Sequence, residues 1–313
     1  MSNPETATPA GVTVVPRPRN LEGALWMIAS GVAFTGFVTL TKLISATYDP
    51  GFLAFWRTAI AMLITLPAVF YYGFSILKLH QPGLVFARSI FGTLGFAFGA
   101  YAVSDQMGLP LSEFNAVSFS RAMFVTVIAV IFLKETAGWH RWGATIVGFI
   151  GVLVMTQPQS GISAGMLLAL AAAACTAGAI ALVKTLSKRH PPITLLIWAN
   201  ILSTLMLTPL AFMTWPETIP PLVDWGWIGL MGLCGVLGQY MYIRGMSMGD
   251  ASFLSPIDYL RLPMAALVDW GLFQALPGQW TWLGTAIIIS ATAYITIREQ
   301  QLKKRRMTVP PPL

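Results

Sequence analysis

The sequence predicts an all-α integral membrane protein in which ten transmembrane helices form two inverted five-helix repeats. Three observations lead to this fold class: an apolar composition, apolar stretches of membrane length that recur along the chain, and an internal repeat. Of the 313 residues, 56% are hydrophobic and only 10% are charged, whereas about 25% of residues are charged in a typical soluble protein. With a mean hydropathy of +0.69, the chain has too few polar residues to cover the surface of a soluble protein of this size. Soluble enzymes, disordered proteins and coiled coils are therefore excluded.

The apolar stretches follow one another between two polar tails. Most hold roughly 18–22 residues, enough for a helix to cross a bilayer core of about 30 Å. The predicted helices cover residues 23–43, 51–72, 83–103, 111–132, 140–156, 164–185, 192–213, 225–246, 251–273 and 280–298. We expect residues 1–20 to be a disordered cytoplasmic tail and residues 299–313 to be a second, basic cytoplasmic tail.

The distribution of basic residues supports ten spans. If the N-terminus lies inside and the helices alternate, cytoplasmic segments hold 15 of the 19 lysines and arginines, and outer segments hold Lys42 alone. The remaining three, Arg57, Arg121 and Arg261, fall within helices. An excess of basic residues on one side is typical of the cytoplasmic face. The sequence therefore predicts a multi-pass protein of the inner (plasma) membrane with both termini in the cytoplasm.

The two halves of the chain match each other in order, which gives two predicted repeats over residues 21–157 and 162–298. The matched pairs, at offsets of 142, 143 and finally 140 residues, are Gly23 and Gly165, Gly36 and Gly178, Lys42 and Lys184, Pro50 and Pro192, Trp56 and Trp198, Pro67 and Pro209, Gly92 and Gly235, Gly95 and Gly238, and Arg121 and Arg261. Because each half has five helices, the second half is inverted in the membrane. Inverted repeats are typical of secondary transporters, whose substrates bind near the midplane between the repeats.

This layout resembles the drug/metabolite transporter superfamily, and in particular its EamA family. Three stretches carry the resemblance: "FWRTAIAMLITLPAVF" in the second helix, "FLKE" at the end of the fourth and "RWGATIVGFIGVLVM" in the fifth. The resemblance covers about residues 22–298, although the second half reads "FQALPGQW" after the ninth helix and has no counterpart to Glu135. It implies a ten-helix bacterial metabolite transporter. Members of the superfamily move amino acids, riboflavin, S-adenosylmethionine, sugars, amines and drugs.

Charged residues inside the membrane are the first candidates for a substrate site. Each costs about 2.5–3.5 kcal/mol at the centre of a helix, so it is expected to face a cavity or a partner. Arg121 and Arg261 are repeat mates near the midplane, and Asp258 precedes Arg261 by one turn. Together they leave a net charge of +1, which suits a carboxylate or phosphate on the substrate. The alternative is a structural ion-pair network that joins two helices.

Two further charges are candidates for coupling or gating. Arg57 follows Trp56 near the start of the second helix. It either snorkels toward an interface anchored by the tryptophan or serves as a gate or substrate contact. Asp269 is expected to pair with Arg57 or Lys42, or to relay protons. The other candidates for lining a binding cavity are Tyr101, Asn115, Asn200, Gln239, Tyr240, Tyr242 and Tyr259.

The sequence contains none of the catalytic or nucleotide-binding motifs that we sought, so no enzyme, ATP-driven pump, metal site or cofactor is predicted. We expect a secondary active transporter that moves a small organic metabolite by alternating access. The expected substrate is amino-acid-like, zwitterionic or carboxylate-bearing, S-adenosylmethionine included. The alternatives are a multidrug or organic-cation exporter with the same fold, and a lipid-handling membrane protein. Expected partners are the metabolite and membrane lipids, with protons as candidate coupling ions and no nucleic acid, in a monomer or homodimer.

Overall fold

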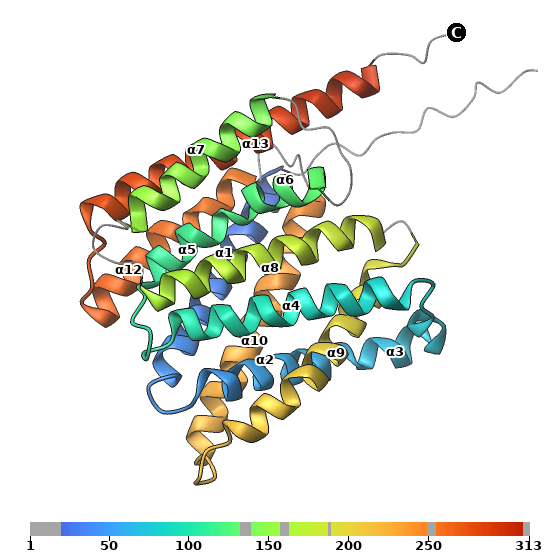
Figure 1. Ribbon diagram of the computed structural model, residues 1–313. Helices are drawn as coiled ribbons and strands as arrows, with labels where there is room; N and C mark the ends of the chain where they lie inside the picture. Colours follow the sequence, from blue (N-terminus) through green and yellow to red (C-terminus); the bar gives the residue numbers. More distant parts are fainter. Residues whose placement is uncertain (1–19, 132–138, 157–162, 187–188, 249–254, 309–313) are drawn as a thin grey trace, which may run out of the picture.

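The computed structural model describes residues 20–131, 139–156, 163–186, 189–248 and 255–308, and this part of the chain contains helices and no strand (Figure 1). The first half contains α1 (Asn20–Ile44), α2 (Pro50–Thr65), α3 (Pro67–Tyr72), the 3-10 helix η1 (Phe74–Leu77), α4 (Pro82–Val103), α5 (Leu111–Phe119), α6 (Arg121–Ile131) and α7 (Trp139–Thr156). The second half contains α8 (Ala164–Leu186), α9 (Pro192–Met213), α10 (Leu222–Met248), the 3-10 helix η3 (Ser255–Leu260), α12 (Arg261–Phe273) and α13 (Gln279–Thr308).

The helices follow the predicted apolar segments, but three of the segments are broken. The segment from Pro50 to Tyr72 breaks before Pro67, because a proline cannot donate a backbone hydrogen bond and its ring clashes with the preceding turn. The other two breaks are at the repeat mates: Arg121 is the first residue of α6 and Arg261 is the first residue of α12. At each of these two breaks the residue before the arginine, Ser120 or Leu260, keeps right-handed helical dihedral angles. The breaks therefore interrupt the regular helix without inserting a loop.

Six helices of the described part are long and apolar enough to cross a membrane, namely α1, the α2–α3 segment, α4, α8, α9 and α10. Ten spans stay a prediction for the remaining segments. At its end the chain differs from our expectation, because α13 continues to Thr308 and residues 299–308 are helical.

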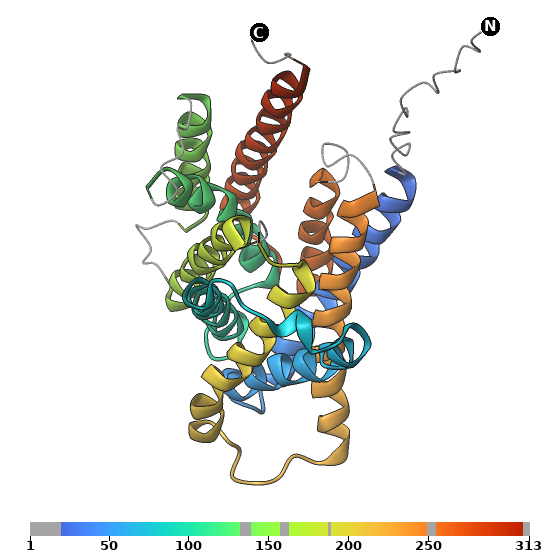
Figure 2. The same ribbon diagram turned by 90° about the vertical axis from the view of Figure 1, so that its right-hand side faces the viewer.

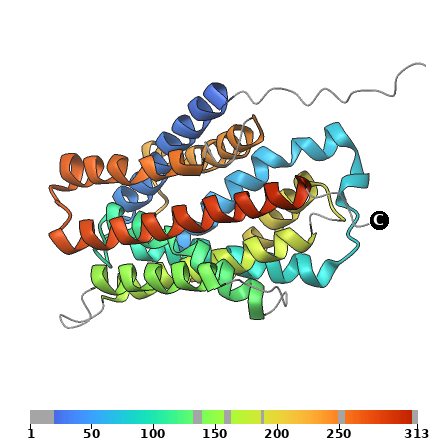
Figure 3. The same ribbon diagram turned by 90° about the horizontal axis from the view of Figure 1, so that it is seen from above.

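The helices pack in a pattern that stays the same when the two repeats are exchanged, as the internal repeat predicts. α1 packs along α10, and its repeat mate α8 packs along α4, the mate of α10. α2 packs on α9 and α7 on α13, so these mates pair with each other (Figures 1 and 3). Figure 2 shows the α1–α10 pair and the α4–α8 pair on opposite sides of the molecule. The space between these two pairs is bounded by both halves of the chain.

Glycines permit close contact in both long pairs. A Cβ atom on Gly95 of α4 would lie 2.8 Å from Thr176 Oγ1 and 3.4 Å from the Ala172 carbonyl oxygen of α8. A Cβ atom on Gly238 of α10 would lie 3.1 Å from the Phe34 ring of α1. Gly95 and Gly238 are repeat mates, so the same small residue allows the close approach of helices in both halves.

The α7–α13 contact offers a matched test of this close packing. A Cβ atom on Gly151 would lie 2.9 Å from Ile287 and 3.0 Å from the Gly284 carbonyl oxygen, whereas one on Gly143 of the same helix would meet nothing within 4 Å. We expect Gly151→Ala to destabilise the protein by about 1–3 kcal/mol through overpacking. Gly143→Ala is expected to be neutral or to stabilise by up to about 1 kcal/mol. Thermal unfolding in detergent measures both, and equal melting temperatures would contradict this packing.

Helix α9 allows a test of orientation. It runs from Pro192 to Met213, so residue 190 precedes one membrane-length helix and residue 218 follows it. The charge distribution predicts that a reporter fused at residue 190 is cytoplasmic and that one fused at residue 218 is periplasmic or extracellular. A periplasmic signal at residue 190 would contradict both the ten-span count and the inverted repeat.

Candidate functional site

A cavity of about 340 Å³ lies between the two halves of the protein. Helices α1, α2, α4, α5 and α6 contribute to its lining from the first half, and α8, α10 and α12 from the second. Its volume is within the range of about 300–1,000 Å³ typical of small-molecule sites. Among the described residues, the charged side chains that line it are three arginines: Arg57, Arg121 and Arg261.

Two of these arginines share one carboxylate. Nη2 of Arg121 lies 3.4 Å from Oδ2 of Asp258, and Nη2 of Arg261 lies 2.7 Å from Oδ1 of the same side chain. Asp258 is buried on η3 and does not line the cavity. The structure thus brings together the three residues that the sequence grouped. The arginines face the cavity, and one carboxylate connects the two halves.

The third arginine, Arg57, comes from α2 and is buried. It lies beside two aromatic rings: its guanidinium carbon is 3.5 Å from the centre of the Phe96 ring and 5.0 Å from that of Phe37. It lines the cavity instead of reaching toward a membrane interface. Its neighbour Trp56 faces elsewhere and packs against Trp225 of α10, with ring centres 4.7 Å apart.

Aromatic rings also lie against the other two arginines. The Phe34 ring centre is 4.2 Å from the guanidinium carbon of Arg261, and the Phe119 ring centre is 5.7 Å from that of Arg121. The sequence analysis did not single out these phenylalanines. Phe34 and Phe37 share one face of α1 with Val38 and Thr41, at helical spacing. That spacing does not indicate which face of α1 lines the cavity, because the other faces of α1 are also largely apolar.

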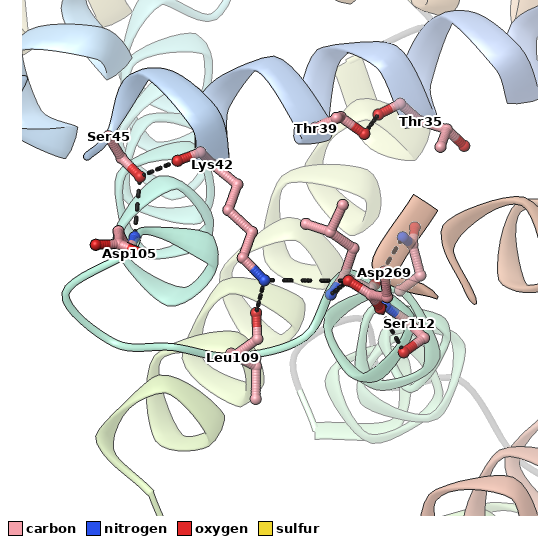
Figure 4. Close-up of polar contacts among 10 residues, drawn as sticks. Thr35, Thr39, Lys42, Ser45, Asp105, Leu109, Ser112 and Asp269 are labelled. Carbon is pink, nitrogen blue, oxygen red and sulfur yellow. Dashed lines mark hydrogen bonds and ion pairs between the residues drawn. The ribbon is translucent and has the colours of Figure 1, made fainter. Parts of the chain in front are cut away.

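Asp269 forms a second polar cluster outside the cavity lining (Figure 4). This fully buried carboxylate of α12 accepts hydrogen bonds from the backbone N–H groups of Leu111 (2.9 Å) and Ser112 (2.7 Å) and from the Ser112 hydroxyl (2.7 Å). Lys42 Nζ lies 4.0 Å from Asp269 Oδ1 and donates a hydrogen bond to the Leu109 carbonyl at 3.4 Å. Asp269 therefore caps α5, and Lys42 is its basic neighbour.

The remaining predicted site residues separate into two groups. Asn115, Gln239 and Tyr242 line the cavity. The Asn115 amide donates a hydrogen bond to the Leu111 carbonyl at 2.9 Å. The others lie outside the lining, where the tyrosines and the asparagine hold helix ends or pack on neighbouring helices.

The contacts of this second group are with neighbouring elements of the fold. The Tyr101 hydroxyl donates to Asp49 at the start of α2 (2.8 Å). Asn200 Nδ2 lies 3.3 Å from the Thr65 hydroxyl and connects α9 to α2. Tyr259 packs on Phe119, with ring centres 4.8 Å apart. Tyr240 is 57% exposed on the outer face of α10, beside Trp26. None of these four side chains is part of the cavity lining.

Known proteins match the chain over nearly its whole length. Residues 21–157 and 163–297 each match the EamA-like transporter family. The chain is 29% identical over 290 residues to a riboflavin transporter of Rhizobium johnstonii, covering 92% of this chain and 95% of that one. It is 27% identical over 286 residues to an S-adenosylmethionine uptake transporter of Rickettsia bellii, covering 91% and 97%. A riboflavin transporter of Brucella anthropi is 31% identical over 252 residues, covering 78% and 86%.

A solved structure shares the fold, with a TM-score of 0.57 at 16% sequence identity over 89% of this chain and 98% of that one. Membrane-length apolar helices around a cavity between two repeats are typical of a multi-pass membrane transporter. The chain belongs to the EamA-like transporter family, as the sequence resemblance predicted. It is therefore a transporter and not an enzyme.

Proposed function

We propose that this protein is a secondary active transporter of the bacterial inner membrane that carries a small organic metabolite by alternating access. The observation that supports the proposal is the cavity itself. It lies between two repeats and is lined by three arginines, of which Arg57 and Arg261 are buried. Charges at membrane depth are costly and are typically functional, and inverted repeats typically bind their substrates at such an interface.

The lining favours a substrate that carries a carboxylate or phosphate. An organic-cation exporter would need acidic groups at its site, but the described lining holds three arginines and no carboxylate. We propose that the cluster of Arg121, Arg261 and Asp258 forms part of the binding centre, with the arginines facing the substrate. The relatives described above are named for riboflavin and S-adenosylmethionine and not for a free amino acid. Of these two compounds, S-adenosylmethionine carries a carboxylate, so it fits the proposed chemistry better.

Counterflow in proteoliposomes tests this proposal. Vesicles that hold unlabelled S-adenosylmethionine or riboflavin should accumulate the same compound in labelled form when the purified protein is present. Ser118 lines the cavity, whereas Ser290 of α13 is exposed. Ser118→Trp should therefore abolish accumulation, and Ser290→Trp should leave it unchanged. No counterflow of either compound by folded protein would contradict the substrate assignment. Normal transport by Ser118→Trp would contradict the cavity as the route.

A further inference from the structure

The three cavity arginines are not equivalent in their partners. Arg121 and Arg261 are both within ion-pair distance of Asp258. Arg57 is only 6% exposed, yet within the described residues no carboxylate lies within ion-pair distance of it and no group accepts a hydrogen bond from it. Its buried Nε is without a hydrogen-bond partner there. Because an arginine remains charged in proteins, this is an uncompensated positive charge at the cavity wall, which is unfavourable unless something binds it.

The two rings beside Arg57 leave its N–H groups available to a ligand. Phe96 and Phe37 lie against the guanidinium group through cation–π contacts, at 3.5 Å and 5.0 Å. Such contacts stabilise a buried cation in part, but they satisfy none of its N–H donors. The five N–H donors of a guanidinium lie in its plane, a geometry that matches a carboxylate or phosphate in a bidentate arrangement.

The internal repeat argues against a purely structural role for this arginine. Trp56 and Trp198 are matched at an offset of 142, so the counterpart of Arg57 on α9 is Ala199. Ala199 is buried at 5% exposure, which means that the same helix in the other half packs without a cation. The arginine is therefore an addition to one half of a repeated architecture.

We propose that Arg57 is the anion-binding subsite of the cavity and takes the carboxylate or phosphate group of an organic anion, while Arg121 and Arg261 stay engaged with Asp258. The inference rests on the proposed function in one respect, namely that the ligand is the transported metabolite. It assigns the carboxylate or phosphate group of that metabolite to Arg57, whatever the net charge of the rest of the molecule.

Thermal unfolding of the purified protein in a neutral detergent tests the subsite with simple monosubstituted benzenes that differ in charge. Benzoate and phenyl phosphate should raise the melting temperature, whereas neutral benzamide and cationic benzylammonium should not. Riboflavin 5′-phosphate should stabilise more than riboflavin. Equal effects of benzoate and benzamide on the wild-type protein would overturn the proposal. An effect of inorganic phosphate as large as that of phenyl phosphate would overturn its assignment to an organic anion.

Substitutions test whether the anionic probes bind at Arg57. Arg57→Met should weaken the apparent affinity for phenyl phosphate at least tenfold, while its melting temperature without ligand stays at least as high as that of the wild type. Arg88 of α4 is a matched control, because its Nε is likewise buried without a hydrogen-bond partner but the side chain does not line the cavity. Arg88→Met should bind phenyl phosphate like the wild type. If Arg57→Met does not fold, Arg57→Gln and Arg57→Lys provide the same comparison, and unchanged binding by a folded variant would overturn the subsite.

The transport assay keeps this test separate from that of the proposed function. Anion stabilisation that depends on Arg57, without counterflow of any compound, would contradict transport and leave the anion subsite supported. Counterflow without any preference for the anionic probes would support transport and contradict the subsite.

Discussion

Asp269→Ala is expected to destabilise the protein by about 3–5 kcal/mol, the cost of removing one partner from a buried charged cluster. The fully buried carboxylate accepts three hydrogen bonds at the start of α5 and lies 4.0 Å from the Lys42 ammonium group. Without it, two backbone N–H groups of α5 lose their acceptor and Lys42 loses its counter-ion. Thermal or denaturant unfolding in detergent measures the loss.

Asp105 supplies the control for this experiment. It is an exposed acidic residue in the connection that leads to α5, so Asp105→Ala removes the same charge without stranding a buried group. Its melting temperature should match that of the wild type. If Asp269→Ala unfolded at the same temperature as Asp105→Ala, the carboxylate would not hold α12 against α5.

Asp258 and its two arginines give the second large effect, and here stability and transport should separate. Arg261→Ala leaves Asp258 with only the longer contact to Arg121, so a loss of about 3–5 kcal/mol is expected. Arg261→Lys keeps a cation beside Asp258, but a lysine cannot also present a planar set of donors to the cavity. We therefore expect Arg261→Lys, and likewise Arg121→Lys, to be folded and nearly inactive in counterflow, and Asp258→Asn to change the pH dependence of transport.

The outcome of these substitutions distinguishes a binding centre from a structural ion pair. Normal counterflow by both lysine variants, together with unfolding of Arg261→Ala, would make the cluster a structural connection between the two halves. Arg121 is the more accessible arginine, with 29% of its side chain exposed against 10% for Arg261. Water can therefore compensate part of its loss, and Arg121→Ala should destabilise less than Arg261→Ala.

The sequence predicted helix positions well, because apolar length determines them almost alone in a membrane. It also grouped Arg121, Arg261 and Asp258, because the repeat offset aligned the arginines and a three-residue spacing placed the aspartate beside one of them. The break before Arg261 has a local signal in Pro263, which removes a backbone donor. The first repeat has Met123 at the matching position, and no comparable signal marks the break at Ser120.

The sequence pattern could not predict contacts between distant segments of the chain. The Asp269 cluster combines α1, the connection before α5, and α12, and only the folded structure shows that Lys42 is the base beside it. The aromatic rings around Arg57 come from α1 and α4, where phenylalanines that face the cavity and phenylalanines that face lipid look alike in the sequence. The position of Arg57 on the cavity wall follows from tertiary packing for the same reason.

The helix breaks at the two arginines have a mechanical consequence. Each of these segments consists of two helical pieces that meet at one residue, α5 and α6 at Arg121 in the first half, η3 and α12 at Arg261 in the second. Both pivots are bound to a single carboxylate, that of Asp258. We expect a bend at one pivot to displace the other, because the shared ion pairs resist independent movement. The protein would then flex as one linked hinge at the level of the cavity, so that one half rearranges together with the other.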